Sequence, residues 1–432
     1  MKLIDLKNTE KVIITKVSGL IRVRSGFGRR NAFHFLAVIG PGIVVMFADT
    51  DAGSVITAAQ SGAVWGYKLL LLQLLLIPIV YIVQELAVRL GLVTGKGHGE
   101  LIREHFGKTW AWLSVSTLVV ASLGALITEF AGVAGAGLLF GIPPWLSVGM
   151  AVLLLLIVVW TGSYLSVERI AILIGSFELV FLLVAWWARP SPEAMLNGLT
   201  RIPWRQPGYM YLTVANIGAV IMPWMVFYHQ SAVVDKGLKS KDLRASRRDT
   251  ALGAIITQLI MIAVLVAVAA TIGVHKPGES LNTVQQIADA LIPFLGERVG
   301  KILFAMGIVG ASLVAAIVVS LASAWGLGEV SGYKRSLEHQ PRKAPWFYVA
   351  YTAMLVIGGI IVVSETNLIN LSVAIQVMNA ALLPIVLGFL YLLALKALPK
   401  PYRLHGIYSV VVGVIVATIS ILGIYAVISP FF

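Results

Sequence analysis

The chain lacks cysteine and is poor in charge. It has 432 residues and no Cys, only 12% of its residues are Asp, Glu, Lys or Arg, and 58% are hydrophobic. Without cysteine there are no disulfides, no thiolate metal sites and no cysteine nucleophile. Soluble domains carry about 25% charged residues, so this composition excludes a water-soluble enzyme, and the high hydrophobicity excludes intrinsic disorder. We therefore expect the lipid bilayer to be the solvent for most of the chain.

Enzyme motifs are also missing from the sequence. It contains no phosphate-binding Walker loop, no HExxH pair and no nucleophile elbow. We therefore predict that the protein is not an enzyme, and an ATP-driven pump is disfavoured. No resident cofactor and no obligate protein partner are indicated.

Long apolar runs occupy most of the sequence. A membrane-spanning helix needs about 20 predominantly apolar residues, and eleven such stretches can be read along the chain. We predict an all-α polytopic membrane protein with about eleven transmembrane helices, of which the first and sixth are interrupted. The predicted spans are 34–65, 67–93, 109–139, 142–161, 165–187, 207–234, 247–273, 298–330, 345–364, 368–395 and 403–430.

The distribution of basic residues predicts the orientation of the chain. The net charge is +13, and a cytoplasmic N-terminus places most of the 33 Lys and Arg residues in inside segments. Membrane orientation thus explains the excess charge, and no nucleic acid partner is expected. Residues 1–33 are predicted to be a cytoplasmic segment, either disordered or a helix on the membrane surface. We expect a cell membrane location, and the absence of a targeting segment suits a bacterial inner membrane.

The first predicted span contains two acidic residues at its centre. Asp49 and Asp51 lie beside Gly53 and Ser54 within residues 40–63. A charge at the bilayer centre costs a few kcal/mol even on the mildest scale. Two residues apart, the carboxylates would face nearly opposite sides of a continuous helix but the same side of an extended stretch. This pattern favours an unwound segment that lines a wet cavity, and a structural polar patch is the alternative.

The sixth predicted span is interrupted by a proline. Pro223 removes a backbone donor and clashes with the preceding turn, which Gly218 also loosens. The carbonyl of Ala219 would then be free for a cation, and Met222 would bring a thioether to the same place. The alternative is an ordinary proline kink, which is common in membrane helices.

The two interruptions lie five spans apart, in corresponding places of two five-span halves. Such pairing is typical of an inverted-repeat secondary transporter that binds its substrate near the bilayer midplane. We therefore divide the chain into the N-terminal segment, two five-helix repeats and an additional helix. The corresponding ranges are 1–33, 34–187, 188–395 and 396–432.

The residues at these breaks resemble the Nramp family of divalent-metal transporters. The family carries Asp-Pro-Gly-Asn in span one, and here DAGS stands at 51–54, followed by the similar string QSGAVWGYKLL. Span six of the family has Met-Pro-His and a second histidine five residues on; here MPW stands at 222–224 with His229 in the second position. Gln376 matches a glutamine of span ten that helps to hold the metal. The resemblance implies a leucine-transporter-like fold with two inverted five-helix repeats and broken helices 1 and 6.

Several positions depart from the family pattern. Ser54 replaces the Asn, Trp224 replaces the first His, and Asp49 is an additional carboxylate. The acidic pair of span three is reduced to Glu129 with Leu126 three residues earlier, and span nine lacks its internal arginine. This combination is similar to the Nramp-related magnesium transporters, a branch that lacks proton coupling.

The predicted metal ligands combine the two breaks with span ten. Mg²⁺ prefers oxygen ligands and loses its water reluctantly, whereas the sulfur of Met222 favours softer ions such as Mn²⁺, Fe²⁺ or Cd²⁺. A sulfur held away from a hydrated ion would reconcile the two. The predicted site, with Mg²⁺ or Mn²⁺ as transported substrate, consists of Asp51, Ser54, Asp49, Ala219, Met222 and Gln376.

The expected function is import of Mg²⁺, and of Mn²⁺, by alternating access without proton coupling. The alternative is a proton-coupled Mn²⁺/Fe²⁺ symporter of the ordinary Nramp type. A non-transporting receptor on the same fold is disfavoured because no large signalling tail follows the last span. An amino-acid transporter is disfavoured because Asp49 and Asp51 would repel a substrate carboxylate.

Three further ionisable residues within the spans keep more than one interpretation. His229 could carry a proton or act as a passive hydrogen-bonding group. Glu129 could be a remnant of a proton path or a neutral, hydrogen-bonded acid. Glu178 in span five receives no role from the sequence.

Overall fold

The structure, a computed structural model, describes residues 38–160, 163–275, 278–281, 283–291, 296–364 and 368–428. The chain divides into two units, Met1–Ile39 and Gly40–Phe432. The predicted N-terminal segment 1–33 lies outside the described residues. Every described element of the second unit is a helix, which confirms the all-α prediction.

The N-terminal half of the second unit runs from the first broken helix to the fifth predicted span. Asp51 caps the start of one helix, and Gly95 ends another in the left-handed conformation that glycine favours. The elements are α2 (Pro41–Asp49), α3 (Ala52–Trp65), η1 (Gly66–Leu69), α4 (Leu70–Thr94), α5 (His98–Phe106), α6 (Lys108–Leu138), α7 (Pro144–Trp160), α8 (Tyr164–Gly175), η2 (Ser176–Leu179) and α9 (Val180–Trp187).

The C-terminal half contains the second broken helix and the longest helices. Four of its helices, α10, α11, α12 and α16, begin with a proline in the first turn, where the missing N–H costs nothing. The elements are α10 (Pro192–Thr200), α11 (Pro207–Val220), α12 (Pro223–Asp235), η3 (Ser240–Asp242), α13 (Leu243–His275), α14 (Val284–Leu291), α15 (Glu297–Ser331), α16 (Pro345–Ser364), α17 (Leu368–Lys396) and α18 (Gly406–Ile428).

Within the described residues, nine helical stretches are long and apolar enough to cross a membrane. Two features explain why this number is smaller than the eleven predicted spans. The break in the first span leaves α2 with nine residues and joins α3 to α4 in one stretch, and α7 has 17 residues. The helical, membrane-spanning character is confirmed, and the exact count of eleven stays a prediction.

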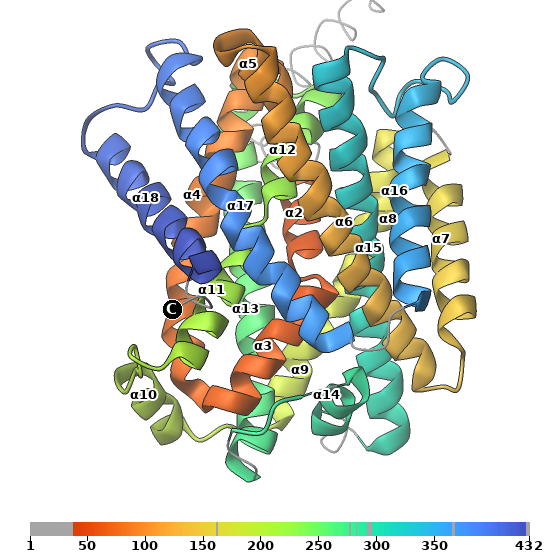
Figure 1. Cartoon of the computed structure of the whole chain (residues 1–432), viewed down its shortest axis with the longest axis vertical. Coiled ribbons are helices and arrows are strands. Elements are labelled where there is room, and N and C mark those ends of the chain that lie inside the picture. Colours follow the sequence, from red (N-terminus) through yellow and green to blue (C-terminus); the bar gives the residue numbers. More distant parts are fainter. Residues whose placement is uncertain are drawn as a thin grey trace, which may run out of the picture. The chain divides into compact units, whose positions relative to one another are not determined.

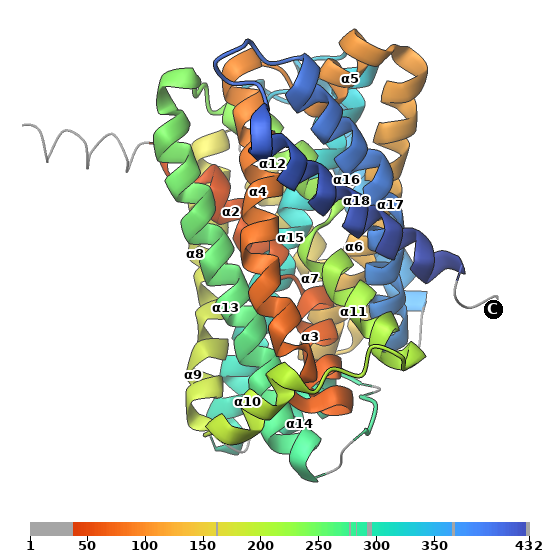
Figure 2. The same ribbon diagram turned by 90° about the vertical axis from the view of Figure 1, so that its left-hand side faces the viewer.

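The two broken helices lie inside the second unit. α2 and α3 follow one another through its middle (Figure 1), and α12 and α11 do the same (Figure 2). They pack against α4, α6, α13, α15 and α17, and nearly every residue of α12 is buried. The apolar residues of α7, α16 and α18 are instead widely exposed, as expected for helices that face lipid. The most buried helices are therefore the interrupted ones.

Candidate functional site

The first break separates α2 from α3 at Thr50 and Asp51. Asp51 has an extended backbone, with φ −67° and ψ 171°, and caps α3. Its Oδ1 atom accepts a hydrogen bond from the backbone N–H of Ser54 at 2.6 Å. This bond satisfies one of the free donors at the helix start, so the acidic residue both opens the helix and stabilises its second half.

The second break separates α11 from α12 at Ile221 and Met222. Both residues have extended backbone conformations, and Pro223 begins the new helix. The proline cannot donate a hydrogen bond to the last turn of α11, and helix ends leave carbonyl oxygens without intrahelical partners. Ala219 lies in that last turn. The sequence prediction of a broken sixth span is confirmed.

The two breaks meet in space. The Ser54 hydroxyl on α3 donates a hydrogen bond to the carbonyl oxygen of Ala219 on α11, over 2.8 Å. α17 passes close to both helices: a methyl group on Gly53 would overlap Nε2 of Gln376, and one on Gly218 would overlap the backbone oxygen of Gln376. Glycine at these two positions therefore lets the Gln376 side chain reach the breaks.

Asp49 lies on the side of the break that faces α13. Its Oδ2 atom accepts a hydrogen bond from the Thr257 hydroxyl at 3.5 Å. The Thr257 hydroxyl also lies 2.5 Å from that of Thr50. Sequence reasoning missed Thr257, although the polar pair Thr257–Gln258 within an apolar run was an available signal.

The sulfur of Met222 is engaged by a neighbouring side chain. The indole N–H of Trp224 donates a hydrogen bond to Sδ of Met222 over 3.2 Å. This bond occupies part of the weak acceptor capacity of the thioether. The residue that replaces the family histidine thus restrains the one soft ligand of the predicted set.

All six predicted ligands are buried, with at most 1% of each residue exposed. Among the described residues, Asp49 Oδ1, Asp51 Oδ2 and Gln376 Nε2 have no hydrogen-bond partner. The segments 31–67 and 206–235, which contain the two breaks, include no Lys or Arg. Buried carboxylates without a basic partner are costly unless a cation or protons compensate them. The arrangement is therefore suited to hold a cation.

The donor set is mixed and open rather than a closed metal cage. Within the described part of the chain, no three His, Asp or Glu side chains form a metal-binding cluster. A dication at the breaks would be held by carboxylate, carbonyl and hydroxyl oxygens together with water. Mg²⁺ is normally bound in this way, through few carboxylates and several retained waters.

Two ionisable residues near the site have defined partners. Glu129 accepts hydrogen bonds from the backbone N–H of Ala52 and from the Thr128 hydroxyl, each at 3.1 Å. It therefore lies at the first break. Nδ1 of His229 lies 3.0 Å from Oε1 of Gln84, which favours the passive hydrogen-bonding interpretation.

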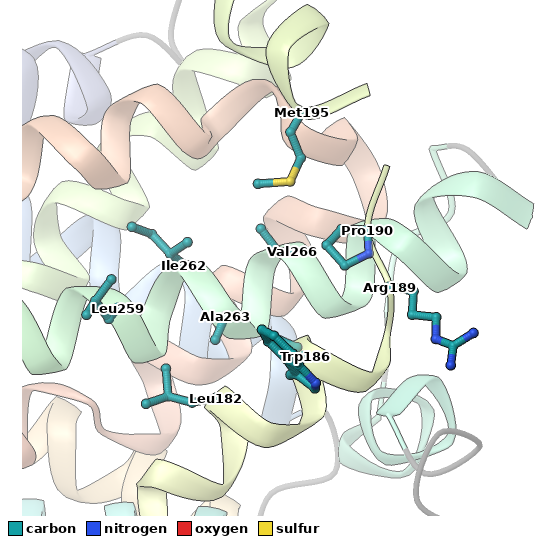
Figure 3. Close-up of a pocket in the computed structure, with 10 residues that line it drawn as sticks. Leu182, Trp186, Arg189, Pro190, Met195, Leu259, Ile262, Ala263 and Val266 are labelled. Atoms are coloured by element: carbon teal, nitrogen blue, oxygen red, sulfur yellow. The ribbon is translucent and has the colours of Figure 1, made fainter. Parts of the chain in front are cut away.

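A separate pocket of about 680 Å³ lies between α9, α10 and α13. Its lining is apolar apart from Arg189, and the Arg189 side chain points away from Leu182, Trp186 and Met195 (Figure 3). Because the lining contains no carboxylate, this pocket is unsuited to a metal ion.

The helix arrangement and the paired breaks place the chain in the leucine-transporter-like fold class. A manganese transporter from Eremococcus coleocola superposes with a TM-score of 0.76 at 20% identity, over 94% of this chain and 89% of that one. A Na⁺-coupled sialic acid symporter superposes with a TM-score of 0.61 at 14% identity, over 91% of this chain and 89% of that one.

Sequence comparison identifies the family. The model of the Natural resistance-associated macrophage protein-like (Nramp) family matches residues 42–429, and the chain belongs to this family. The divalent metal cation transporter MntH of Chromohalobacter salexigens is 29% identical over 310 residues, which are 68% of this chain and 70% of that relative. Metal transporter Nramp6 of Arabidopsis thaliana is 31% identical over 207 residues, 47% of this chain and 39% of that relative. These relatives are transporters and not enzymes, in agreement with the sequence prediction.

Proposed function

We propose that this protein imports Mg²⁺, and Mn²⁺ as a second substrate, across the membrane by alternating access without proton coupling. The observation that carries the proposal is the meeting of the two breaks, where Ser54 contacts Ala219 beside the Asp51 carboxylate. Next to Gly53, Gln376 adds an amide group whose Nε2 has no partner among the described residues and whose Oε1 accepts a hydrogen bond from Asn379. The six ligands predicted from the sequence remain the proposed metal site.

The choice of a hard ion rests on the ligand atoms. Oxygen donors from Asp51, Ser54 and Ala219 suit Mg²⁺ and Mn²⁺. The hydrogen bond from Trp224 to the sulfur of Met222 supports a site in which the thioether contributes little. Ser54 is smaller than the Asn of the family pattern, which leaves room for an ion that keeps part of its water.

The absence of proton coupling rests on sequence features of two helices. Leu126 stands where the family pattern has a second acid on the third span, and the apolar run of α16 contains no basic residue. The driving force would then be the ion gradient and the membrane potential. At about 2.3 kcal/mol per charge per 100 mV, a dication gains roughly twice that amount from an inside-negative potential.

A proton-coupled Mn²⁺/Fe²⁺ symporter is the second candidate. Two similar proteins support it, since one is named a manganese transporter and the other a divalent metal cation transporter. It is also supported by Glu129, which bonds to the backbone of the first break and could exchange a proton there.

The membrane arrangement is part of the proposal. We place the N-terminus in the cytoplasm and the protein in a cell membrane, with a bacterial inner membrane as the expected one. The ranges 34–187 and 188–395 are proposed as the two inverted repeats, and 396–432 as an additional helix.

A flux panel in liposomes tests the proposal. Purified protein is reconstituted, and uptake of Mg²⁺, Mn²⁺ and Ca²⁺ is followed with internal dyes while internal pH is recorded in parallel. The proposal predicts saturable Mg²⁺ and Mn²⁺ influx at constant internal pH. Acidification that accompanies Mn²⁺ influx would favour the symporter, and the absence of any saturable influx would end both candidates.

A further inference from the structure

A cavity of about 570 Å³, here called the arginine pocket, lies between α4, the start of α13 and the connection from α17 to α18. Figure 2 shows this connection crossing the end of α4. The described lining includes three arginines, a histidine and one carboxylate, namely Arg89, Arg247, Arg403, His405 and Glu85. It includes none of the six proposed metal ligands, so the arginine pocket is separate from the metal site.

Glu85 positions two of the three arginines. Its carboxylate is buried, and Oε1 accepts hydrogen bonds from Nε of Arg89 at 3.0 Å and from Nε of Arg247 at 2.7 Å. Oε2 accepts a further bond from Nη2 of Arg89 at 2.5 Å. One carboxylate offsets the charge of only one guanidinium group. The pair of arginines that joins α4 to α13 therefore keeps an excess positive charge.

The third arginine adds to this excess. Among the described residues, Arg403 bonds to backbone carbonyl groups, from Nε to Leu398 at 3.0 Å and from Nη2 to Lys396 at 3.5 Å. Arg247 donates only through Nε, and 42% of its side chain is exposed. The remaining N–H groups of Arg247 and Arg403 are therefore available to an anion. A guanidinium group binds phosphate through parallel N–H donors, which makes phosphate the fitting anion.

An exposed apolar strip continues from the arginine pocket along α4. Tyr81 lines the pocket, and Pro78 and Leu74 precede it at the spacing that places them on the same helix face. Both are exposed, and Leu74 is 42% exposed. On α18, Tyr408 lines the pocket and the following Val411 is 43% exposed. A basic pocket that adjoins exposed apolar helix faces matches a phospholipid, which has an anionic headgroup and apolar chains. A soluble anion would need the pocket alone.

We propose that the arginine pocket binds the phosphate headgroup of an anionic phospholipid from the surrounding membrane, with Arg247 and Arg403 as the phosphate-binding residues. In the proposed orientation the pocket lies on the cytoplasmic side, where the lipid surface is negatively charged and basic pockets between membrane helices bind acidic headgroups. Arginines on this side also set membrane orientation. If that were their only role, the pocket would have no preference for an anionic lipid.

Native mass spectrometry of the full chain in detergent measures this preference directly. The protein is titrated with phosphatidylglycerol, which is anionic, and with phosphatidylcholine of the same acyl chains, which is zwitterionic. The wild-type protein should bind phosphatidylglycerol more tightly. At about 1 kcal/mol per basic residue and 1.4 kcal/mol per tenfold in affinity, Arg247→Gln should weaken phosphatidylglycerol binding about fivefold. The double variant with Arg403→Gln should weaken it roughly thirtyfold, with phosphatidylcholine binding within about twofold of wild type.

The control removes the same charge elsewhere. Arg201 and Arg205 are exposed residues between α10 and α11, and their double replacement by Gln should keep wild-type phosphatidylglycerol binding. The fold should survive Arg247→Gln because Arg89 still pairs with the buried Glu85. If the double variant with Arg403→Gln nevertheless fails to fold, as judged by gel filtration, the fivefold loss expected for Arg247→Gln decides in its place.

Three results would overturn the inference. These are equal binding of the two lipids by the wild-type protein, an equal loss in the control variant, and wild-type phosphatidylglycerol binding in the arginine-pocket variants. A further arm adds excess inorganic phosphate, which should leave the bound lipid in place. Displacement of the lipid by inorganic phosphate would assign the pocket to a soluble anion instead. Ion uptake does not enter these measurements, so failure of the proposed function would leave this inference standing.

Discussion

The Ser54 hydroxyl donates a hydrogen bond to the carbonyl oxygen of Ala219 over 2.8 Å, across 165 positions of sequence. This contact joins the start of α3 to the end of α11, the two places where membrane helices are interrupted. Each interruption alone could be a structural kink. Their contact brings a carboxylate, a hydroxyl group and a carbonyl from the end of α11 into one buried place, which is a suitable environment for a metal ion.

Asp51→Asn separates the charge of this residue from its role in the fold. Asparagine is as good a helix N-cap as aspartate, so the hydrogen bond from the Ser54 N–H is kept and the melting temperature should change little. Removal of the negative charge should lower Mn²⁺ uptake by roughly a hundredfold or more, by analogy with the loss of a buried charge partner worth about 3 kcal/mol. Uptake in liposomes and thermal unfolding are measured together, with Glu193→Gln as control. Near wild-type uptake would contradict the assigned role.

Trp224→Phe tests whether the indole N–H restrains the Met222 sulfur. Phenylalanine removes the donor of the 3.2 Å hydrogen bond while keeping an aromatic ring. The freed sulfur should bind soft ions better, so the apparent affinity for Cd²⁺ should rise by about three- to tenfold relative to Mg²⁺. Adding Met222→Leu should abolish that gain. A gain that persists in the double variant would show that the sulfur is not involved.

Gly53→Ala tests the position of Gln376. The new methyl group would overlap Nε2 of Gln376 and lie 3.0 Å from the Thr128 hydroxyl. Because a flexible amide can move, the fold should survive with a loss of about 1–3 kcal/mol, but metal uptake should fall severalfold. Gly388→Ala in α17 is the control, since nothing lies near that position. It should leave uptake unchanged and stabilise the helix by about 0.5–1 kcal/mol. Equal uptake by the two variants would refute a role for Gln376.

The α5 helix, outside the membrane-spanning stretches, provides a pH prediction. Burial lowers the pKa of His98 to about 4, and its Nδ1 atom lies 3.2 Å from Oε1 of Gln230. Between pH 6.5 and about 4, the unfolded chain therefore binds a proton that the folded protein does not. The free energy of unfolding should fall as pH falls through this window and level off below it. Thermal unfolding in detergent at several pH values measures this slope. His98→Gln should make this slope smaller. An unchanged slope in the variant would contradict the assignment of the pH dependence to His98.

The sequence predicted the fold class and both breaks because these depend on local patterns. Long apolar runs indicate membrane spans, and Asp49, Asp51 and Pro223 stand where a continuous apolar helix would be disrupted. The Nramp resemblance, read from short motifs at the breaks, is confirmed at the level of the family. Specificity for Mg²⁺, the absence of proton coupling and the ligand set stay predictions.

Other features could not be predicted because they depend on packing between distant segments. Thr257 reaches the first break only because α13 packs against α2. The bond between Trp224 and Met222 is local, but it depends on the extended backbone of Met222 before α12. Periodicity in a single sequence contains none of this information.

The most direct test of the central claim is anomalous X-ray diffraction at the manganese edge from crystals of the protein loaded with Mn²⁺. We predict an anomalous peak between the Asp51 carboxylate and the Ala219 carbonyl oxygen, and its loss in Asp51→Asn crystals prepared in the same way. A Mn²⁺ peak only at other places, or an equal peak in the variant, would contradict a metal site at the meeting point of the two breaks.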